Sequence, residues 1–266
     1  KMNTYYIGTE HTTLDEIEQV IESGCEIALS ETAIKNIEHC RRYLDEKMKN
    51  REKPIYGITT GFGSLCNTSV SEDELEQLQE NLIKSHSCGM GDEVEQRIVR
   101  LMMLLKVKNM SYGISGVCVS TAQRLVDFYN KGITPVVYQL GSLGASGDLA
   151  PLAHITLAML GMGEVYYKGE KRNSADVLAE LDMEPLRLKS KEGLALINGT
   201  QFMLSHAIDA LLRGRKILKN ADIIATMSLE GFNGLADPFT ENLHTIRPHK
   251  GQIKTAQNIR GYLAGS

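Results

Sequence analysis

The sequence predicts a mainly α-helical chain with a small α/β portion at its N-terminus. Apolar residues recur mostly at helical spacing, two helix starts carry capping signatures, and the strand signals are short and few. The 266 residues are enough for one large or two modest domains. A soft boundary near residue 110 separates an α/β portion, residues 1–110, from a helical portion, residues 111–266.

The two helix starts with capping signatures are the clearest local signals. Thr13 and Ser71 each begin a Ser/Thr-x-x-Glu pattern. The apolar stripe after Ser71 predicts a helix that ends near His86, where a glycine-containing segment follows. Further helices are predicted over residues 31–49, 93–109, 115–130, 148–160, 174–181 and 199–230, and one more begins at Ile253. Short strands are predicted at residues 27–29, around residues 56–58 and at residues 164–167, with a hairpin turn at residues 168–170.

Composition argues against several classes of function. A formal net charge of -4 offers no attraction to nucleic acid or to an anionic membrane. No apolar run is long enough to span a membrane, and the N-terminus shows no signal peptide. The five cysteines include no Cys-x-x-Cys pair, which favours reduced thiols in the cytoplasm; they are Cys25, Cys40, Cys66, Cys88 and Cys118. We therefore expect a cytoplasmic protein with neither a nucleic-acid nor a membrane partner.

Residues 141–151 form a glycine-rich segment that leads into a helix. Their sequence is Gly-Ser-Leu-Gly-Ala-Ser-Gly-Asp-Leu-Ala-Pro, with Asp148 as the expected N-cap and Pro151 in the first turn. Taken alone, the segment fits a structural turn or a phosphate-binding loop. It lacks the Lys-Ser/Thr of a P-loop and does not match G-x-G-x-x-G, so nucleotide binding is weakly supported.

These eleven residues closely resemble the signature of the aromatic amino-acid ammonia-lyase and aminomutase family. Three further stretches resemble the family: Pro-Ile-Tyr-Gly-Ile-Thr-Thr-Gly-Phe-Gly at 54–63, Gly-Leu-Ala-Leu-Ile-Asn-Gly-Thr-Gln at 193–201, and Arg-Pro-His-Lys-Gly-Gln at 247–252. Together the four stretches span most of the chain. The resemblance implies the fumarase/aspartase-like fold of the ammonia-lyases, here truncated before the central helical bundle is complete.

The resemblance implies a prosthetic group made from the chain itself. In the family, the tripeptide that corresponds to Ala145-Ser146-Gly147 cyclises, with loss of water, into 4-methylidene-imidazol-5-one (MIO). The residue types suit that chemistry, because Gly147 leaves its nitrogen unobstructed and dehydration of Ser146 gives the methylene. The resemblance also implies that Tyr56 is the general base and that Asn198 contacts the substrate and the prosthetic group. Neither a metal nor a dissociable cofactor is expected.

The implied substrate-binding residues favour histidine as the substrate. Ser85-His86 stands where histidine ammonia-lyases place Ser-His, and Gln201 is also typical of them. Gly63 and Leu149 complete the implied set of substrate contacts. These features predict conversion of L-histidine to urocanate and ammonia.

Other substrates and reactions stay open at the level of sequence. The Thr-Thr-Gly-Phe-Gly stretch, with Thr59 in place of the usual asparagine, is closer to phenylalanine and tyrosine ammonia-lyases. Some tyrosine 2,3-aminomutases resemble the chain at Ser-His-Ser and at the Arg-Pro-His region. A catalytically silent helical scaffold is the non-enzyme alternative.

Part of the implied active site is missing from the sequence. Family chains are about twice this length, and they form homotetramers whose active sites combine residues from several subunits. We therefore expect this chain to be inactive by itself.

Overall fold

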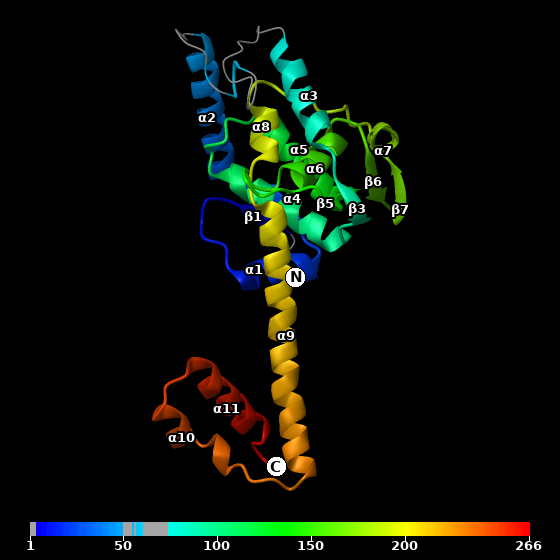
Figure 1. Cartoon of the computed structure of the whole chain (residues 1–266). Helices are drawn as coiled ribbons and strands as arrows, with labels where there is room; N and C mark the ends of the chain where they lie inside the picture. Colours follow the sequence, from blue (N-terminus) through cyan, green and yellow to red (C-terminus); the bar gives the residue numbers. More distant parts are fainter. Residues whose placement is uncertain (1–3, 50–54, 56, 61–73) are drawn as a thin grey trace. The chain divides into compact units, whose positions relative to one another are not determined.

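The chain forms two units, Lys1–Ala207 and Ile208–Ser266, and helices dominate both, as predicted (Figure 1). The computed structural model describes residues 4–49, 55, 57–60 and 74–266. Among these residues, no helix is both long enough and apolar enough to cross a membrane.

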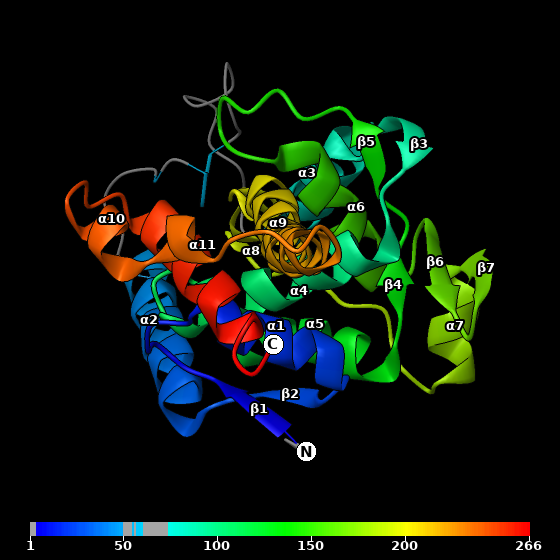
Figure 2. The same cartoon turned by 90° about the horizontal axis from the view of Figure 1, so that it is seen from below.

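The N-terminal part of the first unit is a small β-α-β arrangement. Strand β1 (Thr4–Ile7) pairs in parallel with β2 (Glu26–Leu29), and α1 (Leu14–Ser23) connects them. The predicted capping box at Thr13 is confirmed, and a glycine in the left-handed conformation ends α1. Helix α2 (Glu31–Lys49) follows with the predicted bounds. Figure 2 shows β1 and β2 side by side along one edge of the unit, near α5.

The core of the first unit is built from longer helices. They are α3 (Leu75–His86), α4 (Gln96–Ser111), α5 (Val119–Lys131) and α6 (Leu149–Met159). Helix α4 is buried on most of its surface, and its apolar residues belong to the main core. Each large apolar side chain buried in this way contributes about 1.5–3 kcal/mol. The boundary predicted near residue 110 falls at the end of α4, inside this unit, whereas the compact units divide between residues 207 and 208.

Two small antiparallel sheets flank these helices. Strand β3 (Met90–Glu93) pairs with β5 (Tyr138–Leu140), and β4 (Thr134–Pro135), β6 (Glu164–Tyr167) and β7 (Glu170–Asn173) form the other sheet, followed by α7 (Ser174–Glu180). The predicted hairpin at residues 168–170 is confirmed, with positive φ at both turn residues. The strand predicted around residues 56–58 is wrong for the described residues, because Gly57–Thr59 form a turn in which the amide of Thr59 donates to the carbonyl of Ile55.

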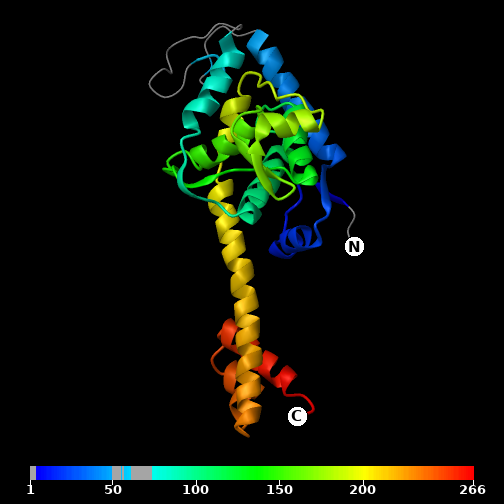
Figure 3. The same ribbon diagram turned by 90° about the vertical axis from the view of Figure 1, so that its right-hand side faces the viewer.

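The second unit consists of helices. Helix α9 (Gln201–Gly231) runs into it, followed by the 3₁₀ turn Asp237–Phe239, α10 (Glu241–Thr245) and α11 (Lys250–Tyr262) (Figure 3). The predicted long helix at 199–230 is confirmed within two residues. The Arg-Pro-His-x-Gly-Gln stretch has a structural role here: Gln252 hydrogen-bonds Nδ1 of His244 at 2.9 Å, while Nε2 of His244 bonds the carbonyl of Pro238 at 3.0 Å.

Candidate active site

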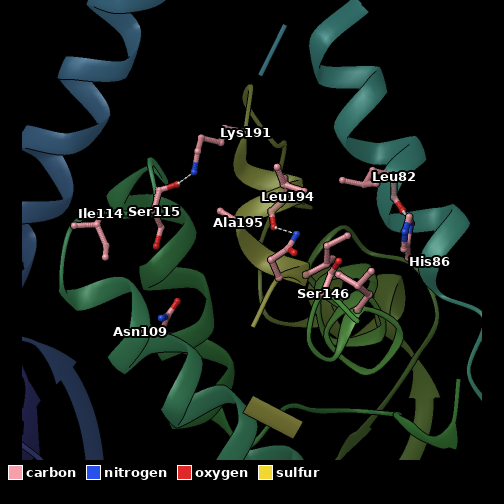
Figure 4. Close-up of a pocket in the computed structure, with 12 residues that line it drawn as sticks. Leu82, His86, Asn109, Ile114, Ser115, Ser146, Lys191, Leu194 and Ala195 are labelled. Atoms are coloured by element: carbon pink, nitrogen blue, oxygen red, sulfur yellow. Dashed lines mark hydrogen bonds between the residues drawn. The ribbon is translucent and has the colours of Figure 1, made fainter. Parts of the chain in front are cut away.

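A cavity in the first unit brings together residues from distant parts of the sequence. It has a volume of about 630 Å³ and is lined by α3, the end of α4, the α4–α5 connection, the segment that leads into α6, and helix α8 (Glu192–Ile197). Figure 4 shows Leu82 and His86 on one side, Asn109 and Ile114 on the other, and Ser146 with α8 between them. The complete lining is Leu82, His86, Asn109, Ile114, Ser115, Ser146, Leu149, Lys191, Leu194, Ala195, Ile197 and Asn198.

Several residues predicted for the site line this cavity. Ser146, His86, Asn198 and Leu149 are among its walls. Ser146 is exposed toward solvent, as is its neighbour in the tripeptide, Ala145. The predicted base Tyr56 and the predicted substrate contact Gly63 lie outside the described residues. Ser85 and Gln201 are close in sequence to lining residues, but neither of them is part of the lining.

Gly147 and Gly199 are in direct backbone contact beside the cavity. The two residues form a parallel β-bridge, and the amide of Asp148 donates to the carbonyl of Gly199 at 2.6 Å. A side chain on Gly147 would overlap the backbone of Gly199, and Gly147 has a φ of +90°. Glycine is therefore required at 147 both for its conformation and for the space it leaves.

Asp148 links the starts of two helices. It occupies the N-cap position of α6, as predicted, but its carboxylate does not bond to the amides of that helix. Instead Oδ2 accepts from the amide of Met203, in the first turn of α9, at 3.0 Å. The side chain is buried, so this charged acceptor stabilises the start of α9 more than an exposed cap would. The predicted N-cap position of Asp148 is therefore confirmed, but the prediction that its side chain caps α6 is wrong, because that side chain bonds to α9 instead.

Asn198 ends α8 rather than starting the next helix. An isolated Asn-Gly-Thr is typical of a helix N-cap, yet Asn198 is the C-cap of α8, and α9 begins at Gln201. The side-chain amide of Asn198 donates to the backbone carbonyl of Leu194 at 3.0 Å. The backbone carbonyl of Asn198 accepts from Nζ of Lys106 at 2.7 Å. Both ends of Asn198 are thereby fixed, with the side chain at the cavity wall.

Helix α8 is held in place by buried polar groups from three other helices. Glu192 is buried and accepts from the amide of Cys118 at 2.8 Å and from the hydroxyl of Thr121 at 2.6 Å. On the other side, the side-chain oxygen of Gln79 in α3 accepts from the amide of Gly193 at 2.9 Å. Arg41 of α2 donates to the carbonyl just before the helix, that of Ser190, at 3.0 Å. Local sequence signals did not predict α8, because the helix is short and its caps come from distant residues.

The hydrogen bonds of His86 define its tautomer. Nδ1 lies 2.9 Å from the carbonyl oxygen of Leu82, which can only accept, so Nδ1 carries a proton. The hydroxyl of Ser85 lies 3.1 Å from the same nitrogen and also donates to the carbonyl of Leu82. In the neutral ring, Nε2 is then left as an acceptor. Ser85 thus contacts the histidine and the backbone rather than the cavity.

The segment after His86 is held by a second histidine. The amide of Gly89 donates to Nε2 of His154 at 3.0 Å, which requires that nitrogen to be unprotonated. Burial lowers the pKa of His154 and favours this neutral form. A side chain on Gly89 would overlap the His154 ring.

Gln201 lies in the first turn of α9, beside Gly199. Its side chain is buried, and in the described structure Oε1 has no hydrogen-bond partner. A side chain on Gly199 would overlap the amide group of Gln201. A buried polar atom without a partner is costly, so this oxygen is available for a further group at the Gly147–Gly199 contact.

Four of the lining residues lie outside the stretches that the sequence indicated as a site: Asn109, Ile114, Ser115 and Lys191. Lys191 has a φ of +71° and donates to the carbonyl of Ser115 at 2.6 Å, closing one wall of the cavity. Asn109 lies near the end of α4, Ile114 and Ser115 follow that helix, and Lys191 precedes α8. Only the fold brings them to the cavity, because they belong to no local motif.

Comparisons with known proteins agree on one group of enzymes. The family described as aromatic amino acid lyase matches residues 12–266. Histidine ammonia-lyase 2 of Fusobacterium nucleatum is 44% identical over 260 residues, covering 98% of this chain and 51% of that protein. Histidine ammonia-lyase of Streptococcus sanguinis is 44% identical over 257 residues, covering 97% and 50%. The chain thus spans about half the length of these curated relatives.

Solved structures give the same result for the fold. The crystal structure of histidine ammonia-lyase from Trypanosoma cruzi matches with a TM-score of 0.90 and 36% identity, covering 99% of this chain and 51% of that one. Tyrosine aminomutase from Streptomyces globisporus matches with a TM-score of 0.92 and 34% identity, covering 99% and 49%.

Proposed function

The chain belongs to the aromatic amino acid lyase family, and on this premise we propose that the whole protein eliminates ammonia from L-histidine to give urocanate. One observation carries the proposal: Ser146, His86 and Asn198, which come from three different elements, line the same cavity. Its volume of about 630 Å³ is in the range of small-molecule sites.

We propose that Ala145-Ser146-Gly147 closes into MIO. The Gly147 nitrogen attacks the Ala145 carbonyl carbon, and the carbonyl oxygen leaves as water with the N–H hydrogens of Gly147 and Ser146. A double bond then joins the former carbonyl carbon to the Ser146 nitrogen. Ser146 loses its hydroxyl and its α-hydrogen as a second water, so atoms balance without an oxidant. When present, the group would supply an electrophilic methylidene at the position of Ser146.

The residues around the tripeptide fit such a group. Gly147 has no side chain to clash with Gly199, and the buried Oε1 of Gln201 lacks a partner nearby. Asp148 does not cap the first amides of α6, so these amides would be available to a ring oxygen on which negative charge develops. These features support a role for Gln201 and the start of α6 in holding the closed ring.

Histidine is favoured over the larger aromatic substrates by His86. With Nδ1 protonated and bound to the backbone, its neutral ring presents Nε2 as an acceptor for the N–H of a substrate imidazole. The threonine at position 59 is a weak argument against histidine as the substrate, because Thr59 is buried and its hydroxyl accepts from the amide of Ile55 at 2.9 Å. Thr59 also makes no part of the cavity lining.

We assign to Tyr56 the removal of the β-proton of the substrate, and to Gly63 a contact with the substrate. Both assignments rest on the resemblance of residues 54–63 to the family stretch. A tyrosine with an ordinary pKa near 10 is a poor base at neutral pH, so this role requires a lowered pKa. Replacing Tyr56 with Phe in the whole protein should abolish turnover while leaving the two-water mass deficit of the tripeptide intact.

A tyrosine 2,3-aminomutase or a tyrosine or phenylalanine ammonia-lyase is the second candidate. The 34% identity to tyrosine aminomutase over nearly the whole chain favours keeping it. The whole protein should be incubated with L-histidine, L-tyrosine and L-phenylalanine and followed by ultraviolet absorbance. Urocanate alone supports the proposal, whereas coumarate, cinnamate or a β-amino acid without urocanate overturns it.

We further propose that activity requires residues beyond this chain and a homotetramer. Several large apolar side chains at and near the site are exposed in this chain, among them Ile114 and Leu143. Intact mass under denaturing conditions tests electrophile formation: a deficit of two waters is expected in the whole protein, and Ser146→Ala should lack it. A complete, assembled protein with the full mass would instead indicate a silent scaffold.

A further inference from the structure

Lys106 is among the largest fully buried side chains of the described structure and plays no part in the proposed reaction. It lies on α4, is 1% exposed, and shares that helix with buried core residues such as Met102, Met103 and Met110. Its amine makes a 2.7 Å hydrogen bond to the carbonyl oxygen of Asn198, 92 residues away in sequence.

A lysine at this position is unfavourable for packing alone. Burying an ammonium group without a counter-charge is costly, and the first response of the group is to lose its proton. Burial lowers the pKa of Lys106 to about 7. A methionine or leucine would fill the same core space at no such cost. The amine must therefore be explained by what it contacts.

The carbonyl that Lys106 contacts belongs to a critical peptide of the site. Asn198 presents its side chain at the cavity wall, and the next residue, Gly199, pairs with Gly147. The carbonyl of Gly199 already accepts from the amide of Asp148. The bond from Lys106 holds the preceding carbonyl, that of Asn198, so the carbonyls on both sides of the Gly199 α-carbon are fixed.

We propose that Lys106 is a positioning residue: by holding the Asn198 carbonyl, it fixes the Asn198 side chain in the cavity and keeps Gly199 against Gly147. The inference rests on the proposed function. Lys106 is not part of the cavity lining, so it acts through Asn198 rather than on the substrate.

The test compares two lysines of the same helix in the whole protein. Lys106→Met keeps the length and removes the donor, and Lys106→Arg keeps a donor. Lys108→Met is the matched control, because the amine of Lys108 also donates to a distant backbone carbonyl, that of Gly8, at 2.7 Å, but away from the site. For each variant, kcat and KM for L-histidine are measured, and kcat is normalised to the fraction of chains with the two-water mass deficit.

We expect Lys106→Met to lower the normalised kcat by about 10-fold or more while KM changes by less than about 3-fold, since misplacing a contacting group reduces rate more than binding. Lys106→Arg should recover part of the loss, and Lys108→Met should stay within about 2-fold of the wild type. A normalised kcat within about 2-fold for Lys106→Met overturns the proposal and leaves the proposed function standing. Should that variant fail to fold, Lys106→Gln, whose shorter amide cannot reach the carbonyl, is judged by the same limits. A wild-type protein that releases no ammonia from any aromatic amino acid refutes the proposed function instead.

Discussion

The buried amine of Lys106 makes stability depend on pH in a way that one substitution removes. Burial lowers its pKa from 10.5 to about 7. Each pKa unit is worth about 1.4 kcal/mol, so charging this group in the folded chain costs about 5 kcal/mol more than in the unfolded chain.

The sign of the effect follows from proton binding. Between about pH 7 and pH 10 the unfolded chain holds the proton on Lys106 and the folded chain does not, so raising the pH favours folding by about 1.4 kcal/mol per pH unit. Below about pH 7 both states are protonated, and the unfavourable contribution is present in full and constant. Lys106→Met has no such group, so its stability should lack this rise.

Urea denaturation followed by circular dichroism measures the difference. Between about pH 7.5 and about pH 9, the wild type should gain about 2 kcal/mol relative to Lys106→Met. The absolute stability of the variant can shift either way, because the Asn198 carbonyl loses a donor, at a cost of about 1–3 kcal/mol. The pH slope is therefore the quantity to compare. Lys131→Met, at an exposed lysine near the end of α5, should run parallel to the wild type.

Parallel curves for the wild type and Lys106→Met, within about 0.5 kcal/mol, would refute the reasoning. They would mean that the amine stays charged in the folded chain, with water or another partner replacing the lost hydration.

Two further predictions concern a backbone contact and a thiol. Gly147→Ala should destabilise the protein by roughly 2–5 kcal/mol in the same denaturation assay, because the added methyl group would overlap Gly199. Gly169 has a similar φ of +84° but open space around it, so Gly169→Ala should cost only about 1 kcal/mol. Equal losses at the two glycines would contradict the contact. Partial burial, reinforced by the Glu192 carboxylate, raises the pKa of Cys118 to about 11. Iodoacetamide at about pH 8 should therefore alkylate it at least about 10-fold more slowly than the exposed Cys88, as followed by peptide mass spectrometry, and equal rates would contradict the raised pKa.

The local elements could largely be predicted from the sequence, because their signals are local. The capping box at Thr13 and the hairpin at residues 168–170 are short-range patterns, and both occur as predicted. Strand β1 was missed because its four residues gain stability only from the parallel partner β2. The turn at Gly57–Thr59 was mistaken for a strand because β-branched residues there serve a side-chain-to-backbone bond instead.

The candidate site was predictable only as far as its motifs reach. Ser146, His86 and Asn198 could be predicted as site residues because each lies in a recognisable stretch, and the three line one cavity. The bond from Lys106 to Asn198 could not, because it joins residues 92 positions apart and depends on how α4 packs against the end of α8. A lysine within the apolar stripe of α4 was nonetheless a visible sign of an unusual buried position.

The same two helix starts that build the site also distribute charge around the tripeptide. Asp148 is the N-cap residue of α6, but its carboxylate accepts from the amide of Met203. It therefore supplies a hydrogen-bond acceptor to the first turn of α9. The first turn of α6 has no side-chain cap and keeps its positive end beside Ser146. One carboxylate thus stabilises the neighbouring helix and leaves the adjacent one uncapped. This asymmetry would favour the electrophile that we propose, because a carboxylate turned toward α6 would place a negative charge where that group would accept electrons.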